Sequence, residues 1–308
     1  LMLRVGLARG DIKLPVLGDL NRRAAVIAGS AASRALTMQH QAQPNAILAD
    51  SSVVEPLGTD VEVVGRDSEG AVIRGLRDWP HHSPRRGEPD LYRKDVERKV
   101  ALLETFVPAW LASRLRSAPR GWRIDGELRR VVIVFADVWG IDGEAGSEEV
   151  ALNISRTMLR AFRRYGGMPL KGDLSVKGHR MMVLFGLHQP SENDPERAIL
   201  AALEATTRVR GFGSARNLEV GVRCAVHEGT VYFGAIGSDR LHDITVVGDA
   251  VNTTARAVNQ ARPFEVIATE SVLEKAGSEF RASDRGPIRV KGLGEPVRLY
   301  VVHSPSQG

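Results

Sequence analysis

Polar side chains that could do chemistry stand at three places among short apolar runs. Asp137 directly follows residues 131–136, an apolar run typical of a strand buried on both faces. His179 stands in a predicted hairpin turn, and Asn252 and Arg256 are four residues apart, so they share one face of a predicted helix. Taken alone, the carboxylate could cap the following helix, the histidine could be a solvated turn residue, and the last two could be a surface hydrogen-bonding pair. Their roles depend on the elements that position them.

Hydrophobic periodicity predicts those elements. After the strand at 131–137 we expect, in chain order, a helix at 148–165, a hairpin at 168–186, a second helix at about 194–210, a strand at 218–226 with a hairpin that continues to 236, and a third helix from about 250. In chain order this is β-α-β-β-α-β, which is typical of a ferredoxin-like fold. The sequence therefore predicts an α+β domain with an antiparallel sheet and helices on one face.

An internal repeat sets the domain organisation, because residues 1–58 and 220–277 look like two copies of one unit without a gap. The matched pairs include Gly10 with Gly229, Gly29 with Gly248, and Pro44 with Pro263. The elements expected at about 127–219 have no counterpart before the earlier copy. We therefore expect the C-terminal half of a first domain at 1–78, a basic linker at 79–126 and a complete second domain at 127–304. On this interpretation the chain lacks the first half of its first domain.

Composition narrows the class of protein. The 308 residues carry a net charge of +5, and residues 77–130 account for it with 13 Lys or Arg against 8 Asp or Glu. Because no aromatic interleaving accompanies these charges, we interpret the segment as a solvated linker, with a helix interrupted at Pro108, and expect no nucleic-acid partner. Cys224 lies in an apolar strand pattern and is expected in the core. No apolar run approaches the roughly 18 residues that span a bilayer, so we expect no membrane span and a cytoplasmic protein.

Four segments together resemble the catalytic domain of class III nucleotidyl cyclases. They are Phe-Ala-Asp-Val-Trp-Gly at 135–140, Lys-Gly-His-Arg-Met-Met-Val-Leu-Phe-Gly at 177–186, Thr-Val-Val-Gly-Asp-Ala-Val-Asn-Thr-Thr-Ala-Arg at 245–256, and Val-Lys-Gly-Leu-Gly-Glu-Pro-Val at 290–297. The resemblance covers about 127–303. Residues 1–77 resemble the end of another such domain, so the whole is similar to tandem-domain soluble adenylyl cyclases of the bicarbonate-responsive type.

The resemblance implies that ATP is cyclised by attack of the ribose 3′-oxygen on the α-phosphate, with two metal ions held by two aspartates. Asp137 stands at the first metal position, but His179 replaces the second aspartate. Asn252 matches the residue that orients the ribose, and Arg256 the residue that stabilises the transition-state oxygens. The domain at 127–304 thus resembles the second domain of a two-domain cyclase, which keeps the ribose-orienting asparagine and the transition-state arginine but has lost the metal site.

The resemblance also implies a base-recognition site. Lys177 and Thr245, with Val246 beside it, match the positions that read the adenine edge, and Lys171 is a weaker candidate for the lysine. Gly140 and the backbone after Asp137 would lie against phosphates.

The first copy has different losses, since Ser33 aligns with Asn252 and Thr37 with Arg256. We therefore expect the second half of an adenylyl cyclase that makes 3′,5′-cyclic AMP and diphosphate from ATP. A first cyclase domain in the same chain, or a cyclase partner in trans, would hold most of the Mg²⁺ or Mn²⁺, and the chain alone would be inactive. A non-catalytic cyclase-homology module that binds nucleotide or regulates a partner is the alternative. A nucleic-acid-binding protein is a third, weaker interpretation that rests on the basic linker.

Overall fold

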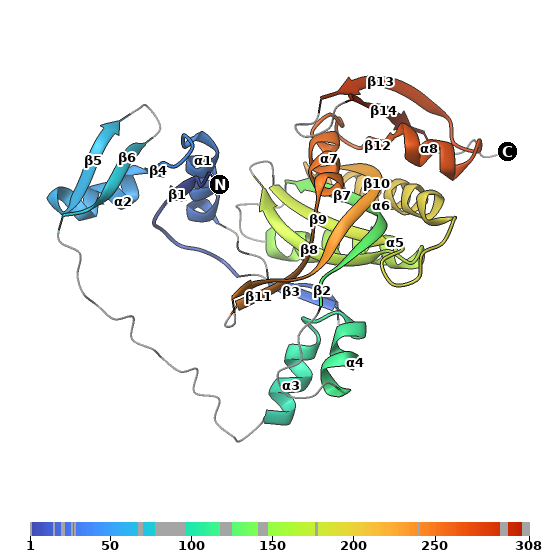
Figure 1. Ribbon diagram of the computed structural model, residues 1–308, viewed down its shortest axis with the longest axis horizontal. Helices are drawn as coiled ribbons and strands as arrows, with labels where there is room; N and C mark the ends of the chain where they lie inside the picture. Colours follow the sequence, from blue (N-terminus) through green and yellow to red (C-terminus); the bar gives the residue numbers. More distant parts are fainter. Residues whose placement is uncertain are drawn as a thin grey trace. The chain divides into compact units, whose positions relative to one another are not determined.

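The structure is a computed structural model (Figure 1). It describes residues 2–14, 16–19, 22–25, 27, 29–66, 70–77, 96–117, 125–140, 147–175, 178–238, 241–289 and 295–303. The described helices are α1 (Ser30–Gln41), α2 (Ser51–Leu57), α3 (Val96–Glu104), α4 (Ala109–Ser117), α5 (Ser147–Arg164), α6 (Asp194–Arg216), α7 (Asp249–Val258) and α8 (Glu270–Ala276), with a 3-10 turn at Gly58–Asp60. The described strands are β1 (Val5–Leu7), β2 (Val16–Asp19), β3 (Arg22–Ala25), β4 (Ile47–Ala49), β5 (Val61–Arg66), β6 (Ala71–Leu76), β7 (Glu127–Trp139), β8 (Met168–Ser175), β9 (Gly178–Phe185), β10 (Gly221–Ser238), β11 (Leu241–Val247), β12 (Val266–Thr269), β13 (Ala282–Ile288) and β14 (Val297–Val302).

The chain folds as two compact units, and each is described by itself. The first contains 1–16, 25–107 and 174–176, and the second contains 17–24, 108–173 and 177–308. The helix expected in the linker is interrupted before Pro108, since α3 ends at Glu104 and α4 begins at Ala109. The domain boundaries expected at 78 and 127 stay predictions. Among the described residues, no helix is both long and apolar enough to cross a membrane.

An eight-stranded sheet forms the centre of the second unit, in the order β13-β14-β12-β10-β7-β9-β8, with β11 paired to β10. The central strand β7 is antiparallel to both β9 and β10, while β12 is parallel to β10. The part β10-β7-β9-β8 has the strand order of the predicted β-α-β-β-α-β unit. The apolar run at 131–136 therefore lies in the middle of the sheet, buried on both faces.

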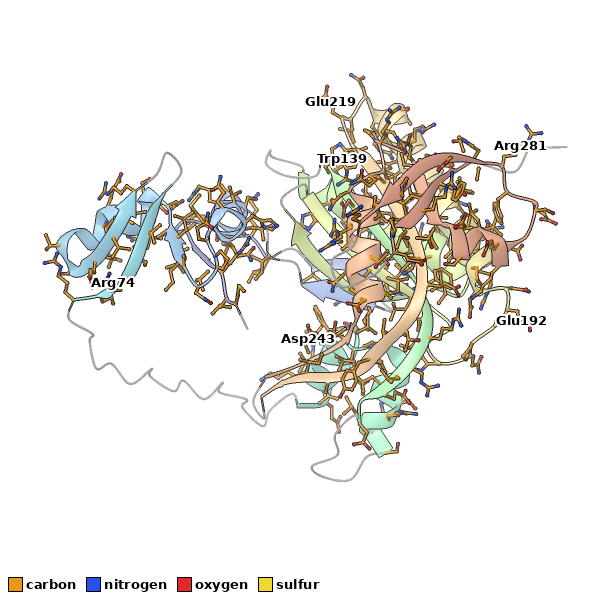
Figure 2. All side chains as sticks on the ribbon, turned by 45° about the horizontal axis from the view of Figure 1, so that its top comes forward. Arg74, Trp139, Glu192, Glu219, Asp243 and Arg281 are labelled. Carbon is orange, nitrogen blue, oxygen red and sulfur yellow. The ribbon has the colours of Figure 1, made fainter. Side chains whose placement is uncertain are left out.

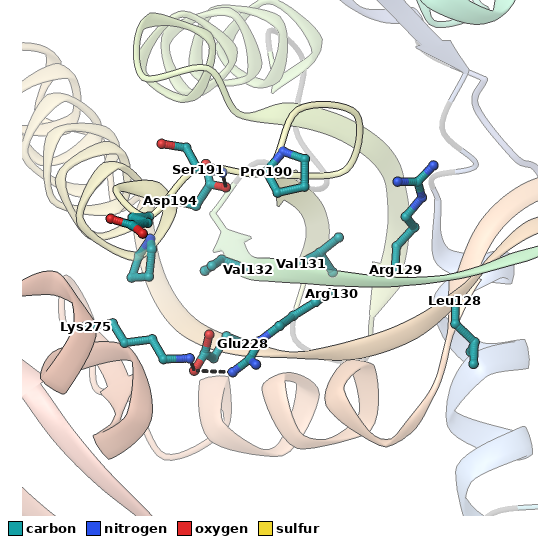
Figure 3. A pocket seen from close by; sticks show the side chains of 12 residues that line it. Leu128, Arg129, Arg130, Val131, Val132, Pro190, Ser191, Asp194, Glu228 and Lys275 are labelled. Atoms are coloured by element: carbon teal, nitrogen blue, oxygen red, sulfur yellow. Dashed lines mark hydrogen bonds and ion pairs between the residues drawn. The ribbon is translucent and has the colours of Figure 1, made fainter.

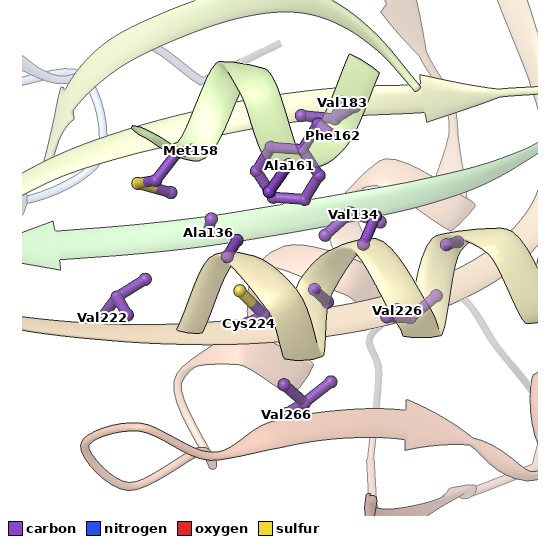
Figure 4. Close-up of a cluster of buried hydrophobic side chains, with 14 of the residues drawn as sticks. Val134, Ala136, Met158, Ala161, Phe162, Val183, Val222, Cys224, Val226 and Val266 are labelled. Atoms are coloured by element: carbon purple, nitrogen blue, oxygen red, sulfur yellow. The ribbon is translucent and has the colours of Figure 1, made fainter. Parts of the chain in front are cut away.

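Both faces of this sheet carry a hydrophobic core, because alternate residues of β7 point to opposite sides. On one side Val132, Val134 and Ala136 pack with side chains of α5 and α6, and Cys224 lies in this core as predicted (Figure 4). On the other side Val131, Ile133 and Phe135 pack with residues of α7. The prediction placed the helices on one face only; α7, which follows β11 in the chain, covers the opposite face.

The sheet of the first unit repeats one part of the sheet of the second unit, the strands β10-β12-β14-β13. The sheet of the first unit has the order β1-β4-β6-β5, and β1 is parallel to β4 with Val5 opposite Ile47. In the second unit β10 is parallel to β12 with Cys224 opposite Val266, the same register displaced by 219 residues. The repeat predicted from the sequence is therefore a structural repeat as well.

Candidate active site

Asp137 is fully buried in β7, and two arginines hold its carboxylate. Arg180 on β9 binds it with both ends of a fork, from Nε to Oδ1 at 2.6 Å and from Nη2 to Oδ2 at 2.8 Å. Arg223 on β10 donates from Nη2 and Nε to Oδ2 at 2.9 and 3.3 Å. These residues lie directly opposite Asp137 in the two strand registers. We call Asp137, Arg180 and Arg223 the Asp137 triad; it carries one negative and two positive charges.

Arg223 also reaches beyond the sheet. Its Nη1 donates to the backbone oxygens of Ala261 at 3.3 Å and Asn259 at 3.5 Å, and its Nη2 to the Asn259 Oδ1 at 3.3 Å. Asn259 directly follows the last residue of α7. The buried guanidinium therefore joins the centre of the sheet to the C-terminal end of α7.

The donor set at Asp137 does not fit Mg²⁺ or Mn²⁺. Hard divalent cations need several oxygen ligands, and both Asp137 oxygens accept hydrogen bonds from arginine. His179 offers nitrogen where the resemblance implies a second carboxylate, and it pairs with Val138 across the strands rather than with Asp137. Within the described part of the chain, no group of three or more His, Cys, Asp or Glu could hold a metal ion. The geometry thus gives Asp137 cationic side-chain partners in place of the metal that the resemblance implies.

The end of β7 is tightly packed against β10. A Cβ at Gly221 would lie 2.2 Å from the Trp139 ring, and a Cβ at Gly140, whose φ is +79°, would lie 2.0 Å from the Glu219 carbonyl oxygen. Figure 2 shows Trp139 and Glu219 at the same end of the domain. Gly140 is therefore required by a close backbone approach, and its predicted place against phosphates stays a prediction.

The α7 helix presents Asn252 and Arg256 on a face turned away from the core. Its inner face is anchored by buried residues: Ala250, Thr253, Thr254, Ala257 and Val258. Gly229 on β10 allows the close packing, because a Cβ there would lie 2.6 Å from the Ala250 Cβ. Asn252 is exposed and Arg256 half-buried, and Arg256 donates one long hydrogen bond, from Nη1 to the Arg289 backbone oxygen at 3.5 Å. In the part of the chain that the structure describes, no carboxylate pairs with Arg256.

Two of the predicted base-recognition residues, Thr245 and Val246, lie on β11, the strand that leads into α7. Thr245 on β11 is half-buried and pairs with Gly234, whereas Val246 is buried in the core beneath α7. Only the backbone of Val246 therefore remains for a ligand. Lys177 lies outside the described residues, and Lys171 lies in β8, where its side chain is not described. The structure thus brings Thr245, Asn252 and Arg256 onto consecutive elements and leaves the lysine untested.

The predicted site residues fall into two groups, because Asp137 lies in the middle of the sheet whereas Asn252 and Arg256 lie on α7. Sequence reasoning missed Arg180 and Arg223 as partners of Asp137. A signal was present for Arg223, which interrupts an apolar strand between Val222 and Cys224, because a buried arginine needs a carboxylate partner. Arg180 follows His179 at the start of its strand and gave no such signal.

A cavity of about 770 Å³ opens at the other end of β7 (Figure 3). Arg130 and Lys275 both contact Glu228, whose side chain is 8% exposed, with Arg130 Nη2 at 3.3 Å from Oε1. Asp194, at the start of α6, is paired with Arg197. The charges of this cavity neutralise one another, and it contains none of the predicted site residues.

The first unit has a different set of side chains at the repeated positions. In α1 the Thr37 hydroxyl donates to the Ser33 backbone oxygen at 3.0 Å, so the residues aligned with Arg256 and Asn252 bond to each other within their own helix. Beside them Arg34 pairs with the buried Asp50 at 2.6 Å. Hydrogen bonds from Ser52 and Arg34 outweigh burial and lower the pKa of Asp50.

Residues 126–304 match the family of adenylate and guanylate cyclase catalytic domains. The chain belongs to this family. An adenylate cyclase of Mycobacterium tuberculosis (strain ATCC 25618 / H37Rv) is 27% identical over 209 residues, which are 67% of this chain and 46% of that protein. An adenylate cyclase of Anabaena cylindrica is 27% identical over 232 residues, or 67% of this chain and 44% of that protein. The cyclase chain described here therefore spans about half the length of the curated relatives it matches.

Solved cyclase structures share the fold. The adenylyl cyclase CyaB from P. aeruginosa matches 59% of this chain and 98% of its own, with a TM-score of 0.53 and 22% identity. A bacterial light-regulated adenylyl cyclase matches 68% of this chain and 62% of its own, with a TM-score of 0.55 and 20% identity. The α+β architecture predicted from the sequence, a class III cyclase domain, is thereby confirmed.

Proposed function

We propose that the cyclase domain of this chain is the half of an adenylyl cyclase that supplies transition-state and base-recognition residues to a metal-binding partner domain. The observation that carries the proposal is the contrast between two elements. Asp137 is buried and neutralised by two guanidinium groups, whereas α7 presents Asn252 and Arg256 outward without a carboxylate partner among the described residues. This contrast supports a domain that keeps one half of a shared site and has lost the other.

In this proposal the ribose 3′-hydroxyl of ATP loses its proton and its oxygen bonds to the α-phosphorus, while the bond from the α-phosphorus to the bridging oxygen of the β-phosphate breaks, so that diphosphate and a proton are released. The Asn252 amide would hold the ribose in the orientation for attack, and the Arg256 guanidinium would neutralise charge that develops on the α-phosphate oxygens. Any Mg²⁺ or Mn²⁺ would belong to carboxylates of the partner domain. That partner would be a first cyclase domain in cis or another cyclase chain in trans.

The Thr245 hydroxyl, the Val246 backbone and Lys177 would read the adenine edge. A lysine donor and a hydroxyl acceptor are complementary to the ring nitrogen and amino group of adenine, whereas guanine presents a carbonyl and a protonated nitrogen. Adenylate cyclases among the relatives support ATP as the substrate. The cytoplasmic location expected from the sequence stays a prediction.

A second candidate function is a non-catalytic cyclase-homology module that regulates a partner. The complete neutralisation of Asp137 by Arg180 and Arg223 favours it, because the domain has replaced a reactive position with a structural one.

Cyclase assays on the whole gene product that carries these residues distinguish the two candidates. Asn252→Ala and Arg256→Ala should each lower turnover by about 10²-fold, far more than they weaken ATP binding, as expected when a transition-state donor is removed. Arg208→Gln on α6, whose side chain is exposed and pairs with Glu204 at 2.7 Å, is the control for loss of one positive charge. Near-normal turnover in both α7 variants would reassign the domain as regulatory.

A further inference from the structure

The Asp137 triad does more than fill the position at which the family resemblance implies a metal. Arg180 has its guanidinium 5.3 Å from the Phe135 ring centroid, with its side chain 21% exposed, while the Arg223 side chain is 9% exposed. Each arginine donates two hydrogen bonds to Asp137, so both the distance and the orientation of its guanidinium group relative to the carboxylate are fixed. The two positive charges balance and exceed the carboxylate, so a divalent cation would meet repulsion and would have to displace charge-assisted bonds.

Arg223 also connects Asp137 to the C-terminal end of α7. Three of its hydrogen bonds end on Asn259 and Ala261, and Arg256 lies only three residues before Asn259. Asp137 fixes one edge of the Arg223 guanidinium, and the other edge binds the chain that leaves the helix. The position of Arg256 is therefore coupled to Asp137 through a rigid planar group.

We propose that Asp137 serves in this chain as a metal-free anchor, in which Arg180 and Arg223 replace the divalent cation and Arg223 positions the C-terminal end of α7. Arg223 is thus a positioning residue for Arg256, and this part of the proposal rests on the proposed function. Arg180 completes the anchor by engaging both carboxylate oxygens, which leaves neither available to a metal ion.

Metal exclusion is tested by electron paramagnetic resonance of Mn²⁺ added to the full chain. We expect the wild type and Asp137→Asn to give the same signal of free Mn²⁺ up to millimolar concentrations. Bound Mn²⁺ in the wild type that is lost in Asp137→Asn would overturn the proposal. This measurement needs no catalytic activity, so its result is independent of the proposed function.

Positioning is tested by amide hydrogen exchange in the full chain. Arg223→Gln should speed exchange at residues 255–261 by about tenfold or more, because bonds to a charged donor are lost, while β12 and β14 change little. Arg223→Lys keeps the positive charge beside Asp137 but not the fork that reaches Ala261, so we expect the same increase. Unchanged exchange at 255–261 in both variants, or an equal increase in Arg208→Gln, would overturn the proposal.

Kinetics of the whole gene product complete the test. We expect Arg223→Lys to lower kcat at least tenfold with KM for ATP nearly unchanged, because a displaced Arg256 affects the transition state more than the ground state. A normal kcat with faster exchange would overturn the positioning role. If Arg256→Ala itself leaves turnover normal, the proposed function fails, whereas the Mn²⁺ and exchange measurements still decide the anchor.

Discussion

Replacing Asp137 by alanine should destabilise the cyclase domain strongly, and the structure gives the size of the effect. The carboxylate is fully buried and accepts four hydrogen bonds from two arginines. Its removal leaves two guanidinium groups without a counter-charge; Arg180, which is 21% exposed, can turn to solvent, but Arg223 cannot. Breaking a buried ion pair from one side costs roughly 3–5 kcal/mol, and we expect Asp137→Ala to fall in this range. Arg180→Gln leaves a neutral Asp137–Arg223 pair and should cost only about 1–2 kcal/mol.

Urea unfolding, monitored through hydrogen exchange of the β7 and β10 amides, measures this free energy of unfolding for the cyclase domain itself. The double variant Asp137→Ala/Arg180→Gln should be less destabilised than the sum of the single variants by about 1–3 kcal/mol, since one repulsion is removed. Asp284→Ala, which breaks the exposed ion pair with Arg298, is the control and should change stability little. A near-neutral Asp137→Ala, or additive effects in the double variant, would refute the reasoning.

The remaining predictions concern three other side chains. Burial lowers the pKa of His227 to about 4, against about 6.5 in an unfolded chain, so its stabilising contribution is complete above pH 6.5 and is lost as the pH falls towards 4. We expect this loss to reach about 3 kcal/mol in urea titrations and to be absent in His227→Asn; parallel pH profiles would contradict the assignment. Burial also raises the pKa of Cys224 to about 12, so iodoacetamide should label it only after unfolding, and rapid labelling of the native chain would contradict the core placement. Lys177→Glu should reduce or invert the ATP over GTP ratio of kcat/KM in the whole gene product, whereas an unchanged ratio would make Lys177 an exposed turn residue.

The fold was predictable because its signals are local or periodic. The apolar run at 131–136, the helical spacing at 148–165 and the repeat at an offset of 219 residues each depend on neighbours in the chain, and the structure confirms strand β7, helix α5 and the shared register of the two units. The placement of α7 on the second face of the sheet was missed. Successive side chains of β7 point to opposite faces of the sheet, and Val131 and Ile133 on one face are as apolar as Val132 and Val134 on the other. Both faces therefore need helices packed on them, and α7 packs on the face of Val131 and Ile133.

The candidate site was predictable only in part. Asn252 and Arg256 share a helix face as their spacing implies, and Thr245 stands on the preceding strand. The partners of Asp137 depend on which residues of β9 and β10 lie opposite it, and strand register is set by the whole sheet rather than by local sequence. The resemblance placed His179 at the position of the second metal aspartate, but Arg180, the next residue, is the one that binds the Asp137 carboxylate.

In the proposed function, this chain supplies Asn252 and Arg256 to a site whose metals are held elsewhere. The most direct test measures cyclic AMP formed from ATP and Mn²⁺ by the chain alone and by the chain mixed with a class III catalytic domain that keeps both metal aspartates but has alanine at its own asparagine and arginine positions. We expect product only from the mixture, and we expect it to be lost with Arg256→Ala and kept with the control Arg208→Gln. Cyclic AMP production by the chain alone that Asp137→Asn abolishes would contradict the proposed function.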